Sequence, residues 1–427
     1  MLNRLIPFVV KIKDKNPDIY HKIIALGKFI FKKRLGIYPR VLGNEVSAVK
    51  RVLRSSQWNM AYGKGLEHEK LEKDFTDFIK TPYAIAVGSG GMAIQMSLRA
   101  LGIRPGDEVI LQVDTCSATA FAIMNAGATP IFADICLNTF MLDKESILKN
   151  ASPRTKAVLA THMWGNAENI GIIQELCQEN KWIFIEDACL SLGTKVKNQQ
   201  AGYFGNVGIF SFGCIKPIQG GEGGMIVTSD EKLAKELRAM RHWGDRTIDF
   251  GERDVTQLSF NGRMSEIVAA VVREQLKGYP KYLSMLQHNV ANFAKFLTNV
   301  PEISIVTGMG TIQDSVYSQV VLKINPTAQI SKQKLFDSLK EMGIPVWHAN
   351  FELITQLSFF KQGSWEQWIL VGDIDNIKKN YSADFPNAKI IYEALGIGLG
   401  KMNFLSKGNL SYLKENLSIA LKEAKNG

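Results

Sequence analysis

Seven short apolar segments, most of them separated by helix-like stretches, constrain the fold of this chain more than any other feature. The expected strands are residues 84–87, 108–113, 130–133, 157–161, 182–186, 207–212 and 224–228. The expected helices are residues 44–54, 68–78, 92–101, 118–126 and 170–180. This alternation predicts an α/β domain with a mainly parallel seven-stranded sheet, and near-continuous apolar strands indicate that both sheet faces are covered.

Composition restricts the class of protein. A chain of 427 residues with 46% hydrophobic content can bury the cores of about two or three domains. No segment approaches the ~20 apolar residues of a membrane span, and no secretory leader pattern is present. Five widely spaced cysteines favour neither a disulfide framework nor a zinc motif. We therefore expect a cytoplasmic protein without a metal site.

The net charge of +10 is concentrated at the N-terminus. Residues 1–40 contain ten Lys or Arg and two Asp, and the rest is nearly neutral. We therefore expect no nucleic-acid partner for the main body. Ile19, Ile23, Leu26 and Ile30 form a helical stripe in this extension, which we expect to pack on the protein or a partner subunit. Peripheral contact with an anionic membrane is the alternative.

Polar or glycine residues lie at or just after the ends of three of the expected strands, where ligands of such sheets bind. The turn 88–91 opens a helix, so its N–H groups could hold a phosphate, although such turns are often only structural. Asp187 could cap a helix or pair with a protonated pyridine nitrogen. Ser211 could satisfy the backbone or donate to a phosphate.

Lys216 follows the last apolar strand but one and precedes the glycine-rich stretch 220–224. A lysine in this place is usually a solvated surface residue. Together with Asp187 and the turn 88–91, it instead suits covalent attachment of an aldehyde cofactor.

These features resemble the DegT-type sugar aminotransferases, which are fold type I enzymes that use pyridoxal phosphate. The resemblance runs from about residue 43 to 286 and more faintly to the C-terminus. The segments that carry it are 88–90, 101–110, 119–120, 127–130, 155–157, 162–165, 186–188, 210–212, Lys216, 221–224 and 261–264. The resemblance implies a fold type I large domain followed by a smaller α+β domain.

The resemblance also implies roles for single residues. Lys216 would form the Schiff base with the cofactor, and Asp187 would pair with its pyridinium nitrogen. Ser211 and the turn at Gly90 and Gly91 would bind the phosphate. Asn261 would reach the phosphate of the neighbouring subunit, so a homodimer with shared active sites is expected.

Three positions depart from the family pattern. Gly91 stands where a threonine is usual, so one hydroxyl contact to the phosphate is missing. Cys116 replaces an aromatic residue that commonly stacks on the cofactor ring. Leu190 replaces a glutamine beside the cofactor's phenol oxygen. We expect these cofactor-binding positions to alter the pocket and its substrate.

The resemblance implies a ping-pong Schiff-base transfer of an amino group from glutamate or glutamine to a keto sugar, expected to be nucleotide-linked, in polysaccharide or secondary-metabolite biosynthesis. Candidate substrate residues are Tyr62, His162, Trp164 and Trp243. A cyclitol or other cyclic ketone is an alternative acceptor. A sugar dehydratase is a further alternative, although such relatives carry histidine in place of Lys216. The remaining alternative is a non-catalytic regulatory or membrane-docked binding protein.

The expected organisation has three parts: the basic extension 1–40, the cofactor-binding domain 41–285 and a smaller C-terminal domain 286–427. In the last part, a strand at 316–324, a helix at 332–342 and an apolar segment at 344–348 suggest an α+β unit that closes over the site.

Overall fold

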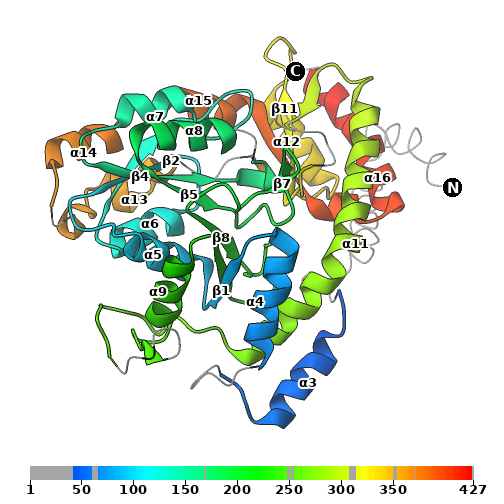
Figure 1. The fold of residues 1–427 in the computed structure, drawn as a ribbon. Coiled ribbons are helices and arrows are strands. Elements are labelled where there is room, and N and C mark those ends of the chain that lie inside the picture. The colour runs from blue at the N-terminus through cyan, green and yellow to red at the C-terminus, as the bar shows by residue number, and fades with distance from the viewer. Residues whose placement is uncertain are drawn as a thin grey trace.

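A seven-stranded sheet forms the centre of the molecule in the computed structural model (Figure 1). The structure describes residues 42–425, except 60–65, 168–169, 248–250, 252–253, 307–313, 350–352 and 370. The extension 1–40 and Tyr62 therefore lie outside the described residues. In spatial order the strands are β1 (Tyr83–Val87), β9 (Gly224–Thr228), β8 (Val207–Ser211), β5 (Ile183–Asp187), β4 (Thr155–Thr161), β2 (Glu108–Gln112) and β3 (Thr129–Ala133).

The sheet is mainly parallel, as the sequence predicts. Only β9 runs antiparallel to its neighbours β1 and β8, and the other adjacent pairs are parallel. All seven expected strands are present, with ends that differ from the prediction by at most two residues. The prediction succeeds because strands buried on both faces are short, continuous apolar runs.

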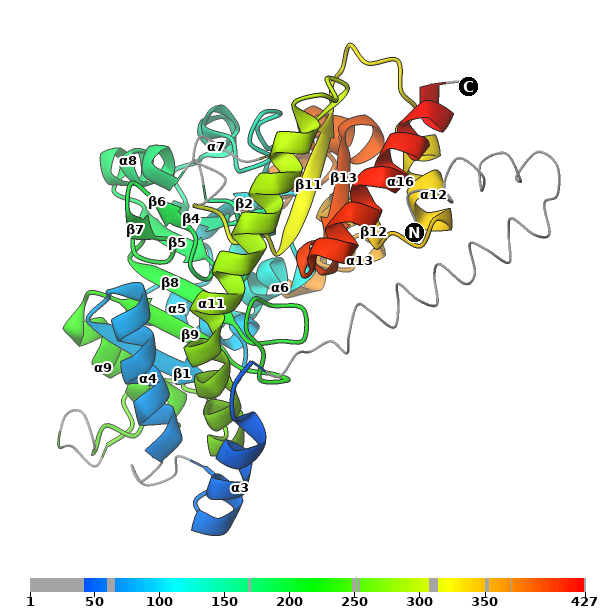
Figure 2. The same cartoon turned by 90° about the vertical axis from the view of Figure 1, so that its right-hand side faces the viewer.

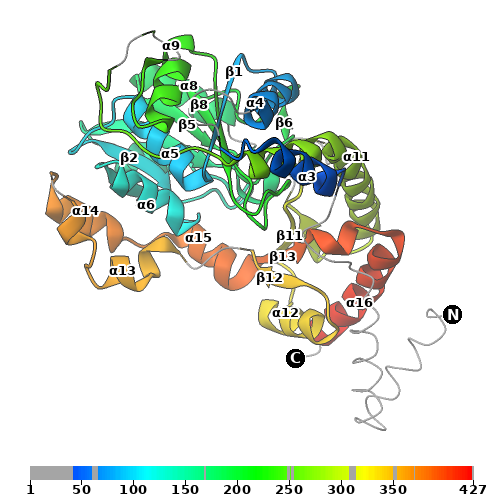
Figure 3. The ribbon, with the colours of Figure 1, turned by 90° about the horizontal axis from the view of Figure 1, so that it is seen from below.

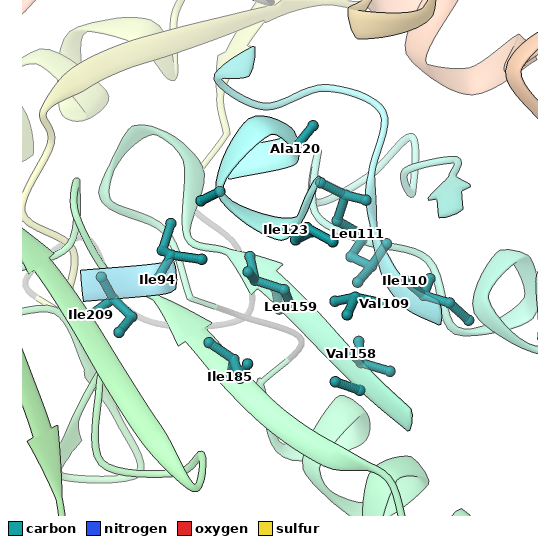
Figure 4. Close-up of a cluster of buried hydrophobic side chains, with 14 of the residues drawn as sticks. Ile94, Val109, Ile110, Leu111, Ala120, Ile123, Val158, Leu159, Ile185 and Ile209 are labelled. Atoms are coloured by element: carbon teal, nitrogen blue, oxygen red, sulfur yellow. The ribbon is translucent and has the colours of Figure 1, made fainter. Parts of the chain in front are cut away.

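Helices cover both faces of this sheet (Figure 1). On one side lie α5 (Gly90–Ala100), α6 (Ser117–Asn125) and α9 (Glu231–Arg241), and on the other α7 (Lys144–Asn150) and α8 (Ile170–Asn180). Figure 4 shows side chains from α5 and α6 gathered with those of the strands, among them Ile94, Ile123, Leu159 and Ile185. All four are buried, so helix and sheet share one apolar core.

One long helix, α11 (Glu266–Leu297), runs past the large sheet and a second, smaller sheet (Figure 2). The smaller sheet is antiparallel and has the order β10 (Ile303–Ile305), β11 (Gln319–Ile324), β13 (Gly396–Gly400) and β12 (Val346–His348). Its core is completed by α12 (Lys332–Glu341), α16 (Lys407–Lys425) and the second half of α11. The expected C-terminal α+β unit is thus an antiparallel sheet with helices.

Part of the C-terminal region packs on the large sheet instead of the small one (Figure 3). This part contains η4 (Ile354–Gln356), α13 (Ser358–Lys361), η5 (Glu366–Trp368), α14 (Ile374–Tyr381), α15 (Pro386–Ile390) and η6 (Ile391–Leu395). The Asn380 amide donates to the carbonyl of Phe132 and accepts from its N–H, each at 2.9 Å, and thereby covers the edge strand β3. The domain limits given above remain a proposal, since α11 runs through residues 285 and 286.

Two helices near the start of the described chain, α3 (Glu45–Ser55) and α4 (Leu66–Ile79), pack against α11. The remaining elements are the hairpin β6 (Lys195–Val196) and β7 (Gln199–Gln200), and the short helices η3 (Met163–Gly165) and η7 (Lys401–Phe404). No helix among the described residues is both long and apolar enough to cross a bilayer.

Candidate active site

Three of the predicted cofactor-binding features lie at the carboxyl ends of strands in the large sheet. Asp187 ends β5, Ser211 ends β8, and the turn 88–91 follows β1. These three strands point the same way, because β9 runs antiparallel to both β1 and β8. Their carboxyl ends therefore open into the same space, which is where ligands bind in α/β sheets.

The start of α5 forms a cradle suited to an anion. Ser89 caps this helix, with its Oγ accepting the N–H of Met92 at 3.1 Å. A Cβ added to Gly90 would lie 2.9 Å from the Cβ of Ser211, so this position has room for glycine only. At Gly91, by contrast, no heavy atom lies within 4 Å of an added Cβ. Open space beside a helix N-terminus and a serine hydroxyl fits a phosphate group.

Asp187 is a buried carboxylate held by three donors. Its Oδ2 accepts from Thr119 Oγ1 at 3.2 Å and Thr161 Oγ1 at 3.5 Å, and its Oδ1 accepts from the N–H of Cys189 at 3.2 Å. Each carboxylate oxygen has two lone pairs, so the group can still accept from a protonated ring nitrogen. Sequence reasoning missed both threonines as partners, because they come from different elements of the sheet layer.

Lys216 lies in a loop that closes on itself. Its N–H donates to the carbonyl of Gly213 at 3.1 Å, and Gly213 forms a bridge with Gly221. Its own carbonyl accepts from Gln219 Nε2 at 3.3 Å and from Lys401 Nζ at 3.2 Å. Neither Gln219 nor Lys401 was predicted as a site residue. The contact with Lys401 joins positions 185 residues apart, for which the sequence carries no local signal.

The charges of Lys216 and Asp187 both influence the pKa of one thiol, that of Cys189. Burial, first, raises the pKa of Cys189 well above its ordinary value, the charge of Asp187 raises it further, and Lys216 acts in the opposite direction. Cys116 also raises the pKa of Cys189. The lysine, the carboxylate and Cys116 are therefore all close enough to Cys189 to influence its pKa.

Cys116 and Leu190, the positions that depart from the family pattern, lie next to these groups in the chain or in space. Cys116 is exposed at the N-terminus of α6, the helix that contributes Thr119. Leu190 is half-buried and directly follows Cys189, and its carbonyl lies 3.3 Å from where a Cβ of Gly165 would be. Both side chains stay candidates for contact with the cofactor.

His162 has a partner on the other side of the sheet. Its Nε2 lies 3.0 Å from Glu186 Oε2, and both residues are buried. Glu186 also accepts the N–H groups of Gly202 and Gly205. Successive strand side chains point to opposite faces, so Glu186 points away from Asp187. This pairing accounts for His162 structurally and gives no support to its contact with substrate.

Both candidate tryptophans have left-handed backbone angles, with φ of 63° at Trp164 and 61° at Trp243. Such angles are costly for a large residue and cluster at functional sites. Trp164 is buried, directly after His162 and Met163. Trp243 is 49% exposed, and the guanidinium of Arg263 lies 3.9 Å from its ring centre.

Asn261 is exposed, and the residue after it contacts the turn 88–91. The carbonyl of Gly262 accepts the N–H of Gly88 at 2.8 Å. Asn261 itself forms a bridge with His242, beside Trp243. The segment 261–263 therefore links the Trp243 loop to the turn 88–91.

A parallel α/β sheet whose strand ends hold a lysine, a carboxylate and an anion cradle defines a class of enzyme that holds a phosphorylated aldehyde cofactor. Comparison with known proteins is consistent with this class. The sequence model of the DegT/DnrJ/EryC1/StrS aminotransferase family matches residues 40–367, and the chain belongs to this family. It is a pyridoxal-phosphate-dependent aminotransferase.

Individual relatives agree with the family assignment. The chain is 30% identical over 314 residues to a GDP-perosamine synthase of Caulobacter vibrioides, covering 73% of this chain and 83% of the relative. It is 28% identical over 325 residues to an L-glutamine:2-deoxy-scyllo-inosose aminotransferase of Streptomyces kanamyceticus, covering 73% and 76%. The solved aminotransferase from Psychrobacter cryohalolentis has the same fold, with a TM-score of 0.80, 24% identity and 91% and 99% coverage.

Proposed function

We propose that this aminotransferase transfers an amino group from glutamate or glutamine to a keto sugar linked to a nucleotide. The observation that carries the proposal is the meeting of Lys216, Asp187 and the Gly90–Gly91 cradle at one sheet edge. The similarity to GDP-perosamine synthases supports a nucleotide sugar as acceptor. The similarity to the scyllo-inosose aminotransferase favours a cyclitol as the second candidate acceptor.

In the proposed mechanism, each residue acts on a different part of the bound cofactor. The first N–H groups of α5 and the Ser211 hydroxyl would hold the phosphate, and the Asp187 carboxylate would pair with the ring nitrogen. When bound, the cofactor supplies an electron sink for the substrate carbon that carries nitrogen. Lys216 would hold the cofactor covalently through its Nζ, and the same Nζ, when free, would be the base that moves the proton at that carbon.

We further propose a homodimer with shared active sites, located in the cytoplasm. Asn261 is exposed and therefore accessible to a second subunit. Three large apolar side chains are also exposed, namely Trp58 at 55%, Ile215 at 57% and Leu258 at 77%. An exposed tryptophan such as Trp58 is typical of the residues that subunit interfaces bury. Five cysteines that form no disulfide suit a reducing compartment.

Reduction of the protein with borohydride in the presence of pyridoxal phosphate tests the role of Lys216. Mass spectrometry of the peptides should show the cofactor attached at Lys216 in the native chain and no attachment there in Lys216→Ala. An adduct confined to other lysines would contradict the proposal.

A screen of acceptors tests the substrate class. Nucleotide-linked keto sugars and cyclitol ketones are each supplied with glutamate or glutamine, and amino product is measured. We expect transfer to a nucleotide-linked keto sugar. Transfer to a cyclitol ketone alone would favour the cyclitol as acceptor over the nucleotide-linked sugar. Transfer to neither would reject both acceptor classes.

A further inference from the structure

Lys401 is a buried lysine that begins η7, directly after strand β13 of the small sheet, and it contacts the loop of Lys216. It is 7% exposed, and its Nζ donates to the carbonyl oxygen of Lys216 at 3.2 Å. Lysine is rarely buried without a specific partner, because removing its charge from water is costly. The same carbonyl accepts from Gln219 within the loop, so the Lys216 peptide is held from the large domain and the small sheet together.

The backbone at Lys401 is firmly placed. Gly400, at the end of β13, is paired with Gln319 of β11, and its N–H donates to the carbonyl of Pro345 at 3.0 Å. A Cβ at Gly400 would lie 2.5 Å from the Trp347 ring, so the chain approaches that ring closely. The ammonium group therefore extends from a rigid strand end.

Buried asparagines hold the short helix η7 that begins with Lys401. Asn289 of α11 donates to the carbonyl of Phe404 at 2.7 Å, and Asn409 of α16 donates to that of Met402 at 2.9 Å. Asn403, within η7, donates to the carbonyl of Pro345 at 3.3 Å. These hydrogen bonds fix η7 to α11, to α16 and to the segment at Pro345, so η7 can in turn fix the position of another loop.

The Lys216 loop is closed at its base, and two side-chain donors, Gln219 and Lys401, bind the carbonyl oxygen of Lys216 itself. Phe212 donates its N–H to the carbonyl of Gly223, and Gly220 donates to that of Phe212, each at 2.9 Å. Beyond this base, the described bonds of the Lys216 backbone go to Gly213, Gln219 and Lys401. Covalent chemistry at Lys216 needs its amine in one place, and this placement depends on the peptide that carries it.

We infer that Lys401 is a positioning residue for Lys216: it fixes the peptide of the cofactor-binding lysine to the small sheet and so couples the two domains at the reacting group. This inference rests on the proposed role of Lys216. The charge relationship agrees with the contact, because burial and then the positive charge of Lys216 lower the pKa of Lys401 to about 7.

The test measures attachment of the cofactor separately from turnover. Cofactor-free protein is mixed with pyridoxal phosphate and cyanoborohydride, and the rate of irreversible attachment at Lys216 is followed by peptide mass spectrometry. A displacement of a reacting group by about 1 Å can cost about 100-fold in rate, so Lys401→Met should slow attachment by about 10- to 100-fold.

Lys332→Met is the matched control. Lys332 is 6% exposed, belongs to the same small domain and donates to a backbone carbonyl, that of Tyr392. Its loss should change stability in a comparable way but leave attachment at Lys216 at the native rate. Equal slowing in both variants, or a native rate in Lys401→Met, would overturn the inference.

Two further variants make the result specific. Should Lys401→Met not fold, Lys401→Gln, which keeps an N–H donor without the charge, is compared with Lys332→Gln in the same way. Gln219→Leu should also slow attachment, and its effect should be non-additive with that of Lys401→Met, because both donors act on one oxygen. If the two substitutions slowed attachment additively, the two side chains would not be acting together on the carbonyl oxygen of Lys216.

Failure of the inference differs from failure of the proposed function. If the native protein attaches the cofactor at Lys216 and Lys401→Met does so equally fast, only the positioning role is rejected. If the native protein attaches no cofactor at Lys216, the proposed role of Lys216 is rejected, and the positioning role of Lys401 is rejected with it.

Discussion

At the residue scale, three hydrogen-bond donors hold the buried carboxylate of Asp187 in place. Asp187→Asn keeps the shape but removes the charge that pairs with the ring nitrogen. Hydrogen bonds to charged groups contribute about 1.5–3 kcal/mol, so we expect the rate of the first half-reaction to fall about 10- to 100-fold. Rapid-mixing kinetics with glutamate measures it.

Asp134→Asn provides the control for this change. Asp134 is another buried carboxylate that follows a strand of the same sheet, but it accepts the N–H groups of Asn387 and Ala388. Its substitution should cost about 1 kcal/mol of stability, as for other helix caps, without affecting the half-reaction. Equal kinetic losses in both variants would mean that Asp187 has no special role.

Gly90 and Gly91 should respond in opposite ways to an added side chain. In Gly90→Ala the Cβ would meet Ser211 at 2.9 Å and Cys189 Sγ at 3.2 Å, so the cradle would be distorted and cofactor affinity should fall. Gly91→Thr adds its side chain into open space and supplies a hydroxyl. A hydrogen bond to a charged group should then raise affinity about 10-fold. Fluorescence titration with pyridoxal phosphate compares the two; a gain in Gly90→Ala would refute the cradle.

Lys401 makes stability depend on pH. Burial and the charge of Lys216 lower its pKa from 10.5 to about 7. Below pH 7 the folded and unfolded chains both hold the proton, and the cost of the buried charge is fully present. Between pH 7 and 10.5 the unfolded chain retains the proton that the folded chain has lost, so stability rises by about 1.4 kcal/mol per pH unit.

Lys401→Met should remove this slope. The difference in unfolding free energy, variant minus native protein, should be largest near pH 6. It should fall by about 2–3 kcal/mol by pH 9, because only the native protein gains stability over this range. Urea unfolding at several pH values measures the difference. Parallel curves for the two proteins would show that Lys401 does not titrate in this range.

At the scale of elements, the first turn of α11 is joined to the start of α4 by a buried carboxylate. Glu266 Oε2 accepts the N–H of Glu67 at 2.6 Å, and its Oε1 lies 2.5 Å from Nδ1 of His68. Burial by itself would raise the pKa of Glu266, but hydrogen bonds from the His68 ring and the Glu67 backbone outweigh it, and the pKa is lowered.

Glu266→Gln should therefore weaken the contact between α4 and α11. We expect a loss of about 1–3 kcal/mol in unfolding free energy near pH 7, because a buried hydrogen-bond partner is left unpaired. The contribution of Glu266 is present above the ordinary carboxyl pKa and disappears as pH falls through the lowered one, so the two proteins should converge in acid. Asp77→Asn, which breaks an exposed pair with Lys73, should change stability by at most about 1 kcal/mol.

At the scale of the whole molecule, shared sites can be tested by mixing two inactive variants. Lys216→Ala lacks the reacting lysine, and Asn261→Ala lacks the residue expected to reach the neighbouring site. In a mixed dimer, one site has both residues intact, so random subunit exchange should restore about a quarter of native activity. Activity of the mixture no higher than that of the separate variants would contradict sharing.

The strands could be predicted because each is a local apolar run, but their spatial order could not. β9 lies between β1 and β8, although β1 and β9 are far apart in the chain. In the same way, the helices of residues 354–390 pack on the large sheet, while strands on both sides of them belong to the small one. Such partners are set by long-range contacts, which leave no periodic pattern in the sequence.

The sequence by itself determined the α/β class, the glycine turn and the presence of Lys216 and Asp187, because chemical type and local spacing are enough to indicate them. The tertiary structure alone decided which groups surround them. It paired Asp187 with Thr119 and Thr161, assigned His162 to Glu186 on the opposite sheet face and brought Lys401 to the carbonyl of Lys216. These contacts join residues far apart in the chain, so only the packing of strands, helices and domains brings their atoms within hydrogen-bond distance.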